Sequence, residues 1–178
     1  MVITEESIRD NRIMEVAKAM MCAARTAPKA RGIDNLVIAT ITNDDIIKLS
    51  EHTKKMYETN NQPFFLRDSE NILKARAIVL IGTKISTIGL NCGLCGFPTC
   101  EEKLSNKKCP CMFNSNDLGI AIGSAVGIAS DNRIDSRIMY SAGIAAKELS
   151  LYGEDVAYGF AIPLSVLGKN PFFDRPTV

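Results

Sequence analysis

The feature that most constrains this chain is a dense run of cysteines near its middle. Five of its six cysteines fall within twenty residues, in the segment CGLCGFPTCEEKLSNKKCPC: Cys92, Cys95, Cys100, Cys109 and Cys111. Thiols packed this closely in one loop are typical of a bound metal ion or a metal–sulfur cluster. The loop that carries them, residues 84–116, is longer than an ordinary connection. We therefore expect it to be an insertion with a function of its own.

The spacing of these cysteines favours a compact iron–sulfur cluster of the [4Fe-4S] type. Two glycines, Gly93 and Gly96, directly follow the first two cysteines and allow the tight turns that a loop around a cluster needs. Three lysines nearby in sequence could offset the negative charge of the cluster: Lys103, Lys107 and Lys108. The firmest candidate ligands are the three cysteines of the C-x2-C-x4-C run: Cys92, Cys95 and Cys100.

The fourth ligand is either Cys109 or Cys111. We favour Cys111, because Pro110 follows Cys109 directly and the two thiols are too close for both to bind one compact cube. Zinc is the rival metal, since structural zinc also uses four cysteines, usually as two CxxC knuckles. Only Cys92 and Cys95 have that spacing here. A redox-active dithiol is the third alternative.

Composition limits the remaining classes. The chain has 178 residues, 46% of them hydrophobic and 23% charged, which predicts a single globular domain over residues 1–178. A net charge of +1 gives no reason to expect nucleic acid as a partner. The N-terminus has no apolar signal segment, and the longest uncharged stretch, residues 118–130, is too short to span a bilayer. We expect a cytoplasmic protein without membrane insertion, in which the thiols stay reduced.

The pattern of apolar residues predicts an α+β fold in which a sheet is packed between helices. A first helix is expected from Thr4, with its apolar stripe including Cys22 as a buried thiol, and a second from residue 43 to about residue 58. Two further helices are expected, one that begins at Asp117 and a later one that ends at about residue 149. Strands are predicted at three apolar runs: residues 36–41, 75–82 and 156–162.

The helix expected from Asp117 carries glycine at every fourth position, namely at Gly119, Gly123 and Gly127. Each glycine costs about 1 kcal/mol relative to alanine in a helix interior, so three on one face need a packing reason. Either another backbone or a flat cofactor is expected on that face. The other faces of this helix are also apolar, which predicts a central position.

The segment ARTAPKARG that follows the first helix gathers three cations, Arg25, Lys29 and Arg31, around a proline turn. Such a loop could hold a phosphate group, because arginine binds phosphate in a bidentate manner. The alternative is an ordinary solvated loop.

At this point the chain resembles known families. CGLCGFPTCEEKL is similar to the CGxCGxPxC iron–sulfur motif of the corrinoid iron–sulfur protein and of a subunit of membrane electron-transport complexes, with matches at Pro98 and the first three cysteines. In that family the fourth cysteine lies where Asp117 stands here. The resemblance covers about a tenth of the chain and leaves the fourth ligand open.

As a whole, the chain resembles the nitroreductase-like flavoproteins and, more closely, an uncharacterised family described as carrying a ferredoxin domain. The resemblance rests on the first helix with its basic loop, the DLGIAIGSAVGIA helix and the segment VAYGFAIPLSVLGK. It implies a homodimer and an FMN phosphate bound by four cations: Arg25, Lys29, Arg31 and Lys169. The loop only approximates the Arg-Ser-x-Arg pattern of nitroreductases.

These observations favour an electron-transfer oxidoreductase that carries an iron–sulfur cluster and, by resemblance, FMN, and that acts on a small molecule or a redox partner. The alternative is a non-enzymatic metal-binding protein, with a structural zinc or a sensing cluster on a degenerate flavoprotein fold. His52 is the only histidine and is expected at the surface, so a histidine-based catalytic site has little support.

Overall fold

The strand β2 (Ala77–Thr83) is buried along its whole length. Successive side chains of a strand point to opposite faces, and β2 follows that rule. Val79 and Ile81 belong to the hydrophobic core on one side of the sheet, whereas Ile78 and Leu80 belong to the core on the other side. Because both faces of β2 are buried, this central strand requires an uninterrupted run of apolar residues.

The computed structural model of the chain describes residues 1–173, so the last five residues of the predicted domain lie outside the description. Four strands form one antiparallel sheet in the order β1-β2-β4-β3. The other elements are α1 (Glu5–Thr26), η1 (Ala30–Gly32), β1 (Leu36–Ile41), α2 (Asp44–Asn60), α3 (Pro63–Ile72), α4 (Cys100–Ser105), α5 (Met112–Asp131), β3 (Asp135–Ser136), α6 (Tyr140–Glu148) and β4 (Tyr158–Ser165).

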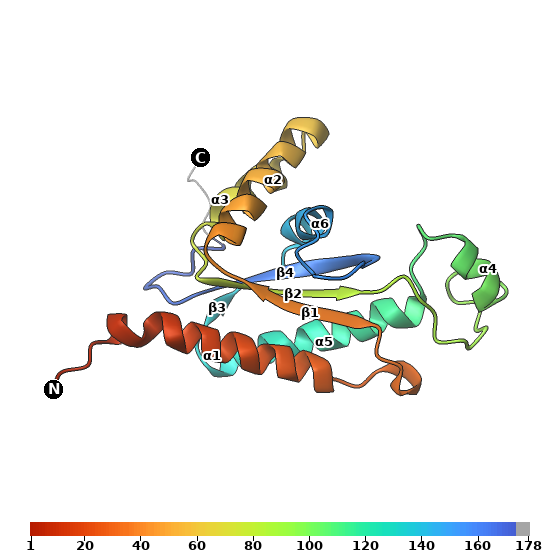
Figure 1. Ribbon diagram of the computed structural model, residues 1–178, viewed down its shortest axis with the longest axis horizontal. Helices are drawn as coiled ribbons and strands as arrows, with labels where there is room; N and C mark the ends of the chain where they lie inside the picture. Colours follow the sequence, from red (N-terminus) through yellow and green to blue (C-terminus); the bar gives the residue numbers. More distant parts are fainter. Residues whose placement is uncertain (174–178) are drawn as a thin grey trace.

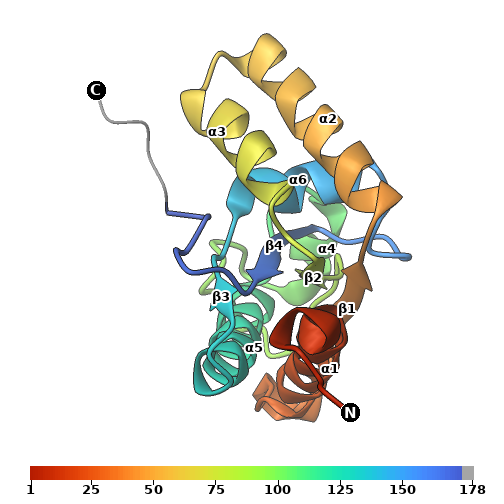
Figure 2. The ribbon, with the colours of Figure 1, turned by 90° about the vertical axis from the view of Figure 1, so that its left-hand side faces the viewer.

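Helices cover both faces of this sheet (Figure 1). Figure 2 shows α1 and α5 side by side beneath the sheet, with α2, α3 and α6 above it. The predicted α+β arrangement of a sheet between helices is confirmed. No helix among residues 1–173 is long and apolar enough to cross a membrane.

The register of the sheet decides which loops meet. Leu36 at the start of β1 and Tyr158 at the start of β4 both pair with Thr83 at the end of β2. The basic loop before β1 and the cysteine segment after β2 therefore leave the same end of the sheet. In Figure 1 both lie on the right, where α4 extends beyond the strands.

Three local features differ from the expectations. The chain forms α3 where no helix was expected, and this helix begins with Pro63 at a first-turn position that tolerates proline. Helix α5 begins at Met112, so Asp117 is a buried residue inside the helix and not its cap. The thiol of Cys22 is exposed, because the buried face of α1 runs through Ile13, Val16, Ala17, Met20 and Ala24.

The glycine-bearing side of α5 is exposed, contrary to the expected central position of this helix. The opposite side is buried against α1 and the sheet and includes Leu118, Ala121 and Ala125. A Cβ atom added at Gly119, Gly123 or Gly127 would meet nothing within 4 Å. Within the described chain, neither a backbone nor a side chain explains these glycines.

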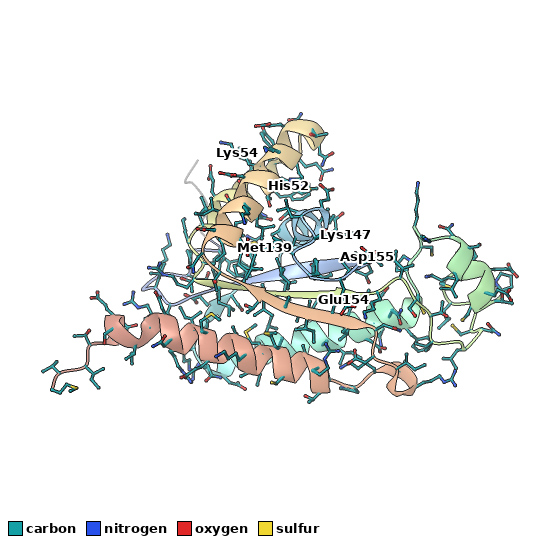
Figure 3. The ribbon with its side chains drawn as sticks, in the orientation of Figure 1. His52, Lys54, Met139, Lys147, Glu154 and Asp155 are labelled. Carbon is teal, nitrogen blue, oxygen red and sulfur yellow. The ribbon has the colours of Figure 1, made fainter. Side chains whose placement is uncertain are left out.

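Glycine does explain one close approach on the other side of the sheet. Met139 precedes α6 and pairs through its backbone with Ala161 of β4 (Figure 3). This pairing draws the helix onto the strand. A Cβ atom added at Gly143 would overlap the carbonyl oxygen of Gly159 and lie 2.6 Å from the Cα atom of Phe160. Only glycine fits at this crossing.

Candidate metal and cofactor site

Four cysteines line one small pocket in the segment between β2 and α5: Cys92, Cys95, Cys100 and Cys111. These are the four ligands favoured from the sequence. Apolar side chains make up much of the remaining wall: Ile88, Leu90, Phe97, Met112 and Phe113. Cys109 is not among the lining residues, and its Sγ lies 3.8 Å from the carbonyl oxygen of Cys95.

Cys100 is the most tightly held of the four thiols. Its backbone N–H donates to Oδ1 of Asn91 at 2.8 Å, and the N–H of Asn91 points back at the Cys100 sulfur at 3.4 Å. This N–H, followed by the Thr87 side chain and two further backbone N–H groups, outweighs desolvation and lowers the pKa of the Cys100 thiol. The segment before the first cysteine thus favours a thiolate at Cys100.

The local backbone of the loop follows from its sequence. Asn91, Gly93 and Gly96 all have positive φ angles of 49°, 72° and 85°, which asparagine and glycine adopt most easily. The Thr99 hydroxyl accepts the N–H of Glu102 and caps the short helix α4, whose first residue is Cys100. Turns at the first two cysteines and a capped helix at the third therefore place three thiols around the pocket.

The chemistry of this donor set fits a thiolate-bound metal ion or cluster. The geometry is not yet that of a formed site, since among residues 1–173 no three histidine, cysteine, aspartate or glutamate side chains are close enough to hold a metal ion. Binding therefore requires the sulfur atoms to move closer together, as is usual where metal binding and local folding are coupled.

A buried lysine lies beside the thiols. The side chain of Lys103, on α4, is 1% exposed and lines the same pocket. Its Nζ donates to the carbonyl oxygen of Ser86 at 3.4 Å. The sequence placed Lys103 near the cluster but gave no sign that it alone among the three neighbouring lysines is buried.

The cations of the basic loop all have partners within the chain. Arg25 donates to Asp34 at 2.6 Å and to the carbonyl oxygen of Leu36 at 3.2 Å. Burial opposes ionisation of Asp34, but the hydrogen bonds from Arg25 and from the Leu36 N–H prevail and lower its pKa. Arg31 has a left-handed backbone and donates to the carbonyl oxygen of Ile88 at 2.9 Å.

The side chain of Lys29 caps the C-terminal end of helix α1. Its Nζ donates to the carbonyl oxygens of Ala24 at 3.0 Å, Ala27 at 2.8 Å and Arg25. A lysine in this position satisfies carbonyl groups that the end of a helix leaves without partners. Its side chain is only 6% exposed, and this burial lowers the pKa of its ammonium group. In this structure Lys29 holds the loop and does not face solvent.

Asp117 fixes the loop from the other side. Both of its carboxylate oxygens accept the backbone N–H of Ala30 at 3.1 Å. Together with the bond from Arg31 to Ile88, this contact joins the basic loop to α5 and to the segment that leads into the cysteines. Sequence reasoning missed this role, although a carboxylate directly before a long apolar run of the helix was a signal for it.

Lys169 does not join the other three predicted cations within one chain. It is exposed and follows β4, whose last residues pair with the start of β2 at the far end of the sheet. Figure 1 shows this turn on the left and η1 on the right. The single histidine also lies elsewhere: His52 faces α6 in the upper layer (Figure 3), where its Nε2 lies 2.7 Å from Glu148.

Comparison with known sequences identifies the family. A model of the family described as uncharacterized proteins containing a ferredoxin domain (DUF2148) matches residues 107–175. An uncharacterized protein of Archaeoglobus fulgidus is 40% identical over 183 aligned positions, covering 98% of each chain. The chain belongs to this ferredoxin-domain family, as the sequence motifs predicted.

Comparison with solved structures identifies the fold. A protein described as a nitroreductase, in complex with FMN, from Desulfovibrio desulfuricans matches with a TM-score of 0.59 at 15% identity, over 92% of this chain and 80% of that one. A BluB-like flavoprotein from Clostridium difficile matches with a TM-score of 0.57 at 19% identity, over 100% and 86%. The predicted nitroreductase-like fold is confirmed, while likeness at such identities carries no chemistry by itself.

Proposed function

We propose that this protein is an electron-transfer oxidoreductase that holds an iron–sulfur cluster at four cysteines: Cys92, Cys95, Cys100 and Cys111. The observation that carries the proposal is that these four thiols line one pocket, whereas Cys109 does not. Membership of a ferredoxin-domain family supports a redox role. When bound, such a cluster exchanges single electrons at a potential set by its charge, hydrogen bonds and solvent exposure.

The residues of the loop supply what such a centre needs. Asn91 orients Cys100 and favours its ionised form. Apolar side chains, including Ile88 and Phe97, line much of the pocket and lower the local dielectric constant, while Cys92 stays exposed to solvent. We infer that residues 84–116 are an insertion within one functional unit that works in the cytoplasm, where thiols stay reduced. Its partner would be a redox protein or a small molecule, with no role for nucleic acid.

We further infer an FMN site beside the basic loop, because the structural relatives include a protein in complex with FMN and a flavoprotein. Arg25 and Arg31 are both exposed and would turn from their present partners toward the phosphate. Lys29 would act indirectly, by holding the loop. Lys169 contributes only if a second copy of the chain supplies it.

A homodimer built on the glycine side of α5 would meet that condition. Gly119, Gly123 and Gly127 are exposed and open, and Ile120 between them is 40% exposed. Analytical ultracentrifugation tests this proposal: Gly123→Glu should convert a dimer into a monomer, while Lys54→Glu, at an exposed position of α2 on the other side of the sheet, should not. A wild-type monomer would contradict it.

A second function is favoured by one observation. Arg25, Lys29 and Arg31 are all engaged in bonds within the chain, as expected for a loop that does not bind phosphate. This supports a non-enzymatic protein in which a zinc ion or a sensing cluster is bound without flavin.

An anaerobic absorption spectrum of the purified protein, with iron, sulfide and zinc analysis, separates these functions. Iron, sulfide and a broad charge-transfer absorbance support the cluster, and flavin released on denaturation supports the oxidoreductase. Iron and sulfide without flavin support the sensor. Zinc in place of iron overturns the cluster and leaves a zinc-bound protein.

A further inference from the structure

Lys103 is an unusual residue to find buried. Lysine is almost never fully buried without a partner of opposite charge. Yet Lys103 is 1% exposed and is among the largest of the fully buried side chains. It lies on α4 three residues after Cys100, so the two side chains are neighbours on the same side of the helix.

The partners of Lys103 do not account for its burial. The only hydrogen bond that its side chain makes within residues 1–173 is to the carbonyl oxygen of Ser86, at a long 3.4 Å. That oxygen also accepts Nδ2 of Asn114 at 3.1 Å. No carboxylate forms an ion pair with Lys103 in this part of the chain. Removing an ammonium group from water without a counter-ion is costly, so an anion is missing from its surroundings.

The pocket that Lys103 lines contains the sources of such an anion, because it is the pocket of the four cysteines. Four thiolates carry more negative charge than a divalent metal ion or an oxidised cluster neutralises. A loaded centre therefore remains anionic, and each added electron makes it more so. Because Lys103 is buried, water screens its charge little, and the ammonium group interacts strongly with a nearby anion.

We propose that Lys103 is the buried counter-charge of the metal centre: a positioning residue that favours the loaded pocket and raises the reduction potential of the centre. This inference rests on the proposed function. Lys107 and Lys108 carry the same charge in the same loop but are exposed, so water and salt screen their effect. The three lysines are therefore not equivalent, and only Lys103 contributes substantially.

Two substitutions distinguish the effect of a buried positive charge from that of an exposed one. Lys103→Met removes the charge and keeps an unbranched side chain only one atom shorter, and Lys107→Met makes the same charge change at an exposed position. In the metal-free protein, Lys103→Met should raise the melting temperature, because an uncompensated buried cation is removed. In the loaded protein it should weaken metal retention about 10- to 100-fold, the usual effect of losing a residue that supports metal ligands. If Lys103 had a merely structural role, Lys103→Met would lower the melting temperature of both the metal-free and the loaded protein.

The measurements are thermal unfolding of the metal-free protein, loss of iron to a chelator, and midpoint potentials from anaerobic titration with dithionite. We expect Lys103→Met to shift the potential of the centre to more negative values, Lys107→Met to leave it unchanged, and Lys103→Arg to retain most of the wild-type value. If the wild-type protein takes up no iron and sulfide, the proposed function fails. If it loads normally and the methionine variants at positions 103 and 107 behave alike, the proposed function stands and the role of Lys103 is refuted.

Discussion

Asn91 and Cys100 hold each other through two contacts in opposite directions: the Cys100 N–H donates to Asn91 Oδ1 at 2.8 Å, and the Asn91 N–H points at the Cys100 sulfur at 3.4 Å. This pair fixes the third cysteine before any metal is present. Because the second contact favours the thiolate, the pKa of Cys100 is lowered.

The first prediction concerns pH. With its pKa lower in the folded than in the unfolded chain, Cys100 adds stability that is fully present above the unfolded pKa and is lost as pH falls through the folded pKa. Between the two values the folded thiol is ionised and the unfolded thiol is not. Alkylation of Cys100 in metal-free protein, followed by mass spectrometry of its peptide, should begin at lower pH in folded protein than in urea-unfolded protein. Identical pH profiles would count against the Asn91 contact.

The second prediction concerns the anchor of the basic loop. Asp117→Ala should destabilise the metal-free protein by about 1–3 kcal/mol, because it leaves the Ala30 N–H without its acceptor. Asp117→Asn keeps one acceptor oxygen and should lose less. Urea unfolding gives both values, and Asp131→Ala, at an exposed position of the same helix, is the matched control. Equal stabilities of the alanine variants at positions 117 and 131 would show that the anchor is unimportant.

The third prediction concerns the crossing of α6 over β4. Gly143→Ala should cost about 1–3 kcal/mol or more, because the new methyl group would collide with backbone atoms of Gly159 and Phe160 that cannot move away. Gly168→Ala, where nothing lies within 4 Å, should have little effect. The free energy of unfolding in urea tests the pair, and a Gly143→Ala variant as stable as the wild type would contradict the packing described for α6.

Much of the fold could be predicted from the sequence, because its signals are local. The β-branched run at Leu36–Ile41 forms β1 with the predicted bounds, and the buried run 75–82 contains most of β2. The fold class follows from the order of such elements. Cys22 and the glycines of α5 show the limit, since an apolar helix pattern does not reveal which side meets a neighbour.

The candidate site could be predicted only in part. The spacing of the cysteines led to the four thiols that share a pocket, because ligand spacing is a local property. The burial of Lys103, the contact of Asp117 with Ala30 and the distance of Lys169 from the basic loop all depend on tertiary packing. Such long-range contacts have no signature in sequence spacing.

The most direct test of the central claim compares the two cysteines that compete for the fourth position. Iron and sulfide should be measured per chain after anaerobic purification of the wild type, Cys109→Ser and Cys111→Ser, with Cys22→Ser as a control outside the loop. We predict that Cys111→Ser loses the cluster, while the variants at positions 109 and 22 keep the wild-type content, because only Cys111 shares the pocket with the other three ligands. Loss of the cluster in Cys109→Ser with a normal content in Cys111→Ser would contradict this assignment, and absence of iron and sulfide from the wild type would contradict the cluster itself.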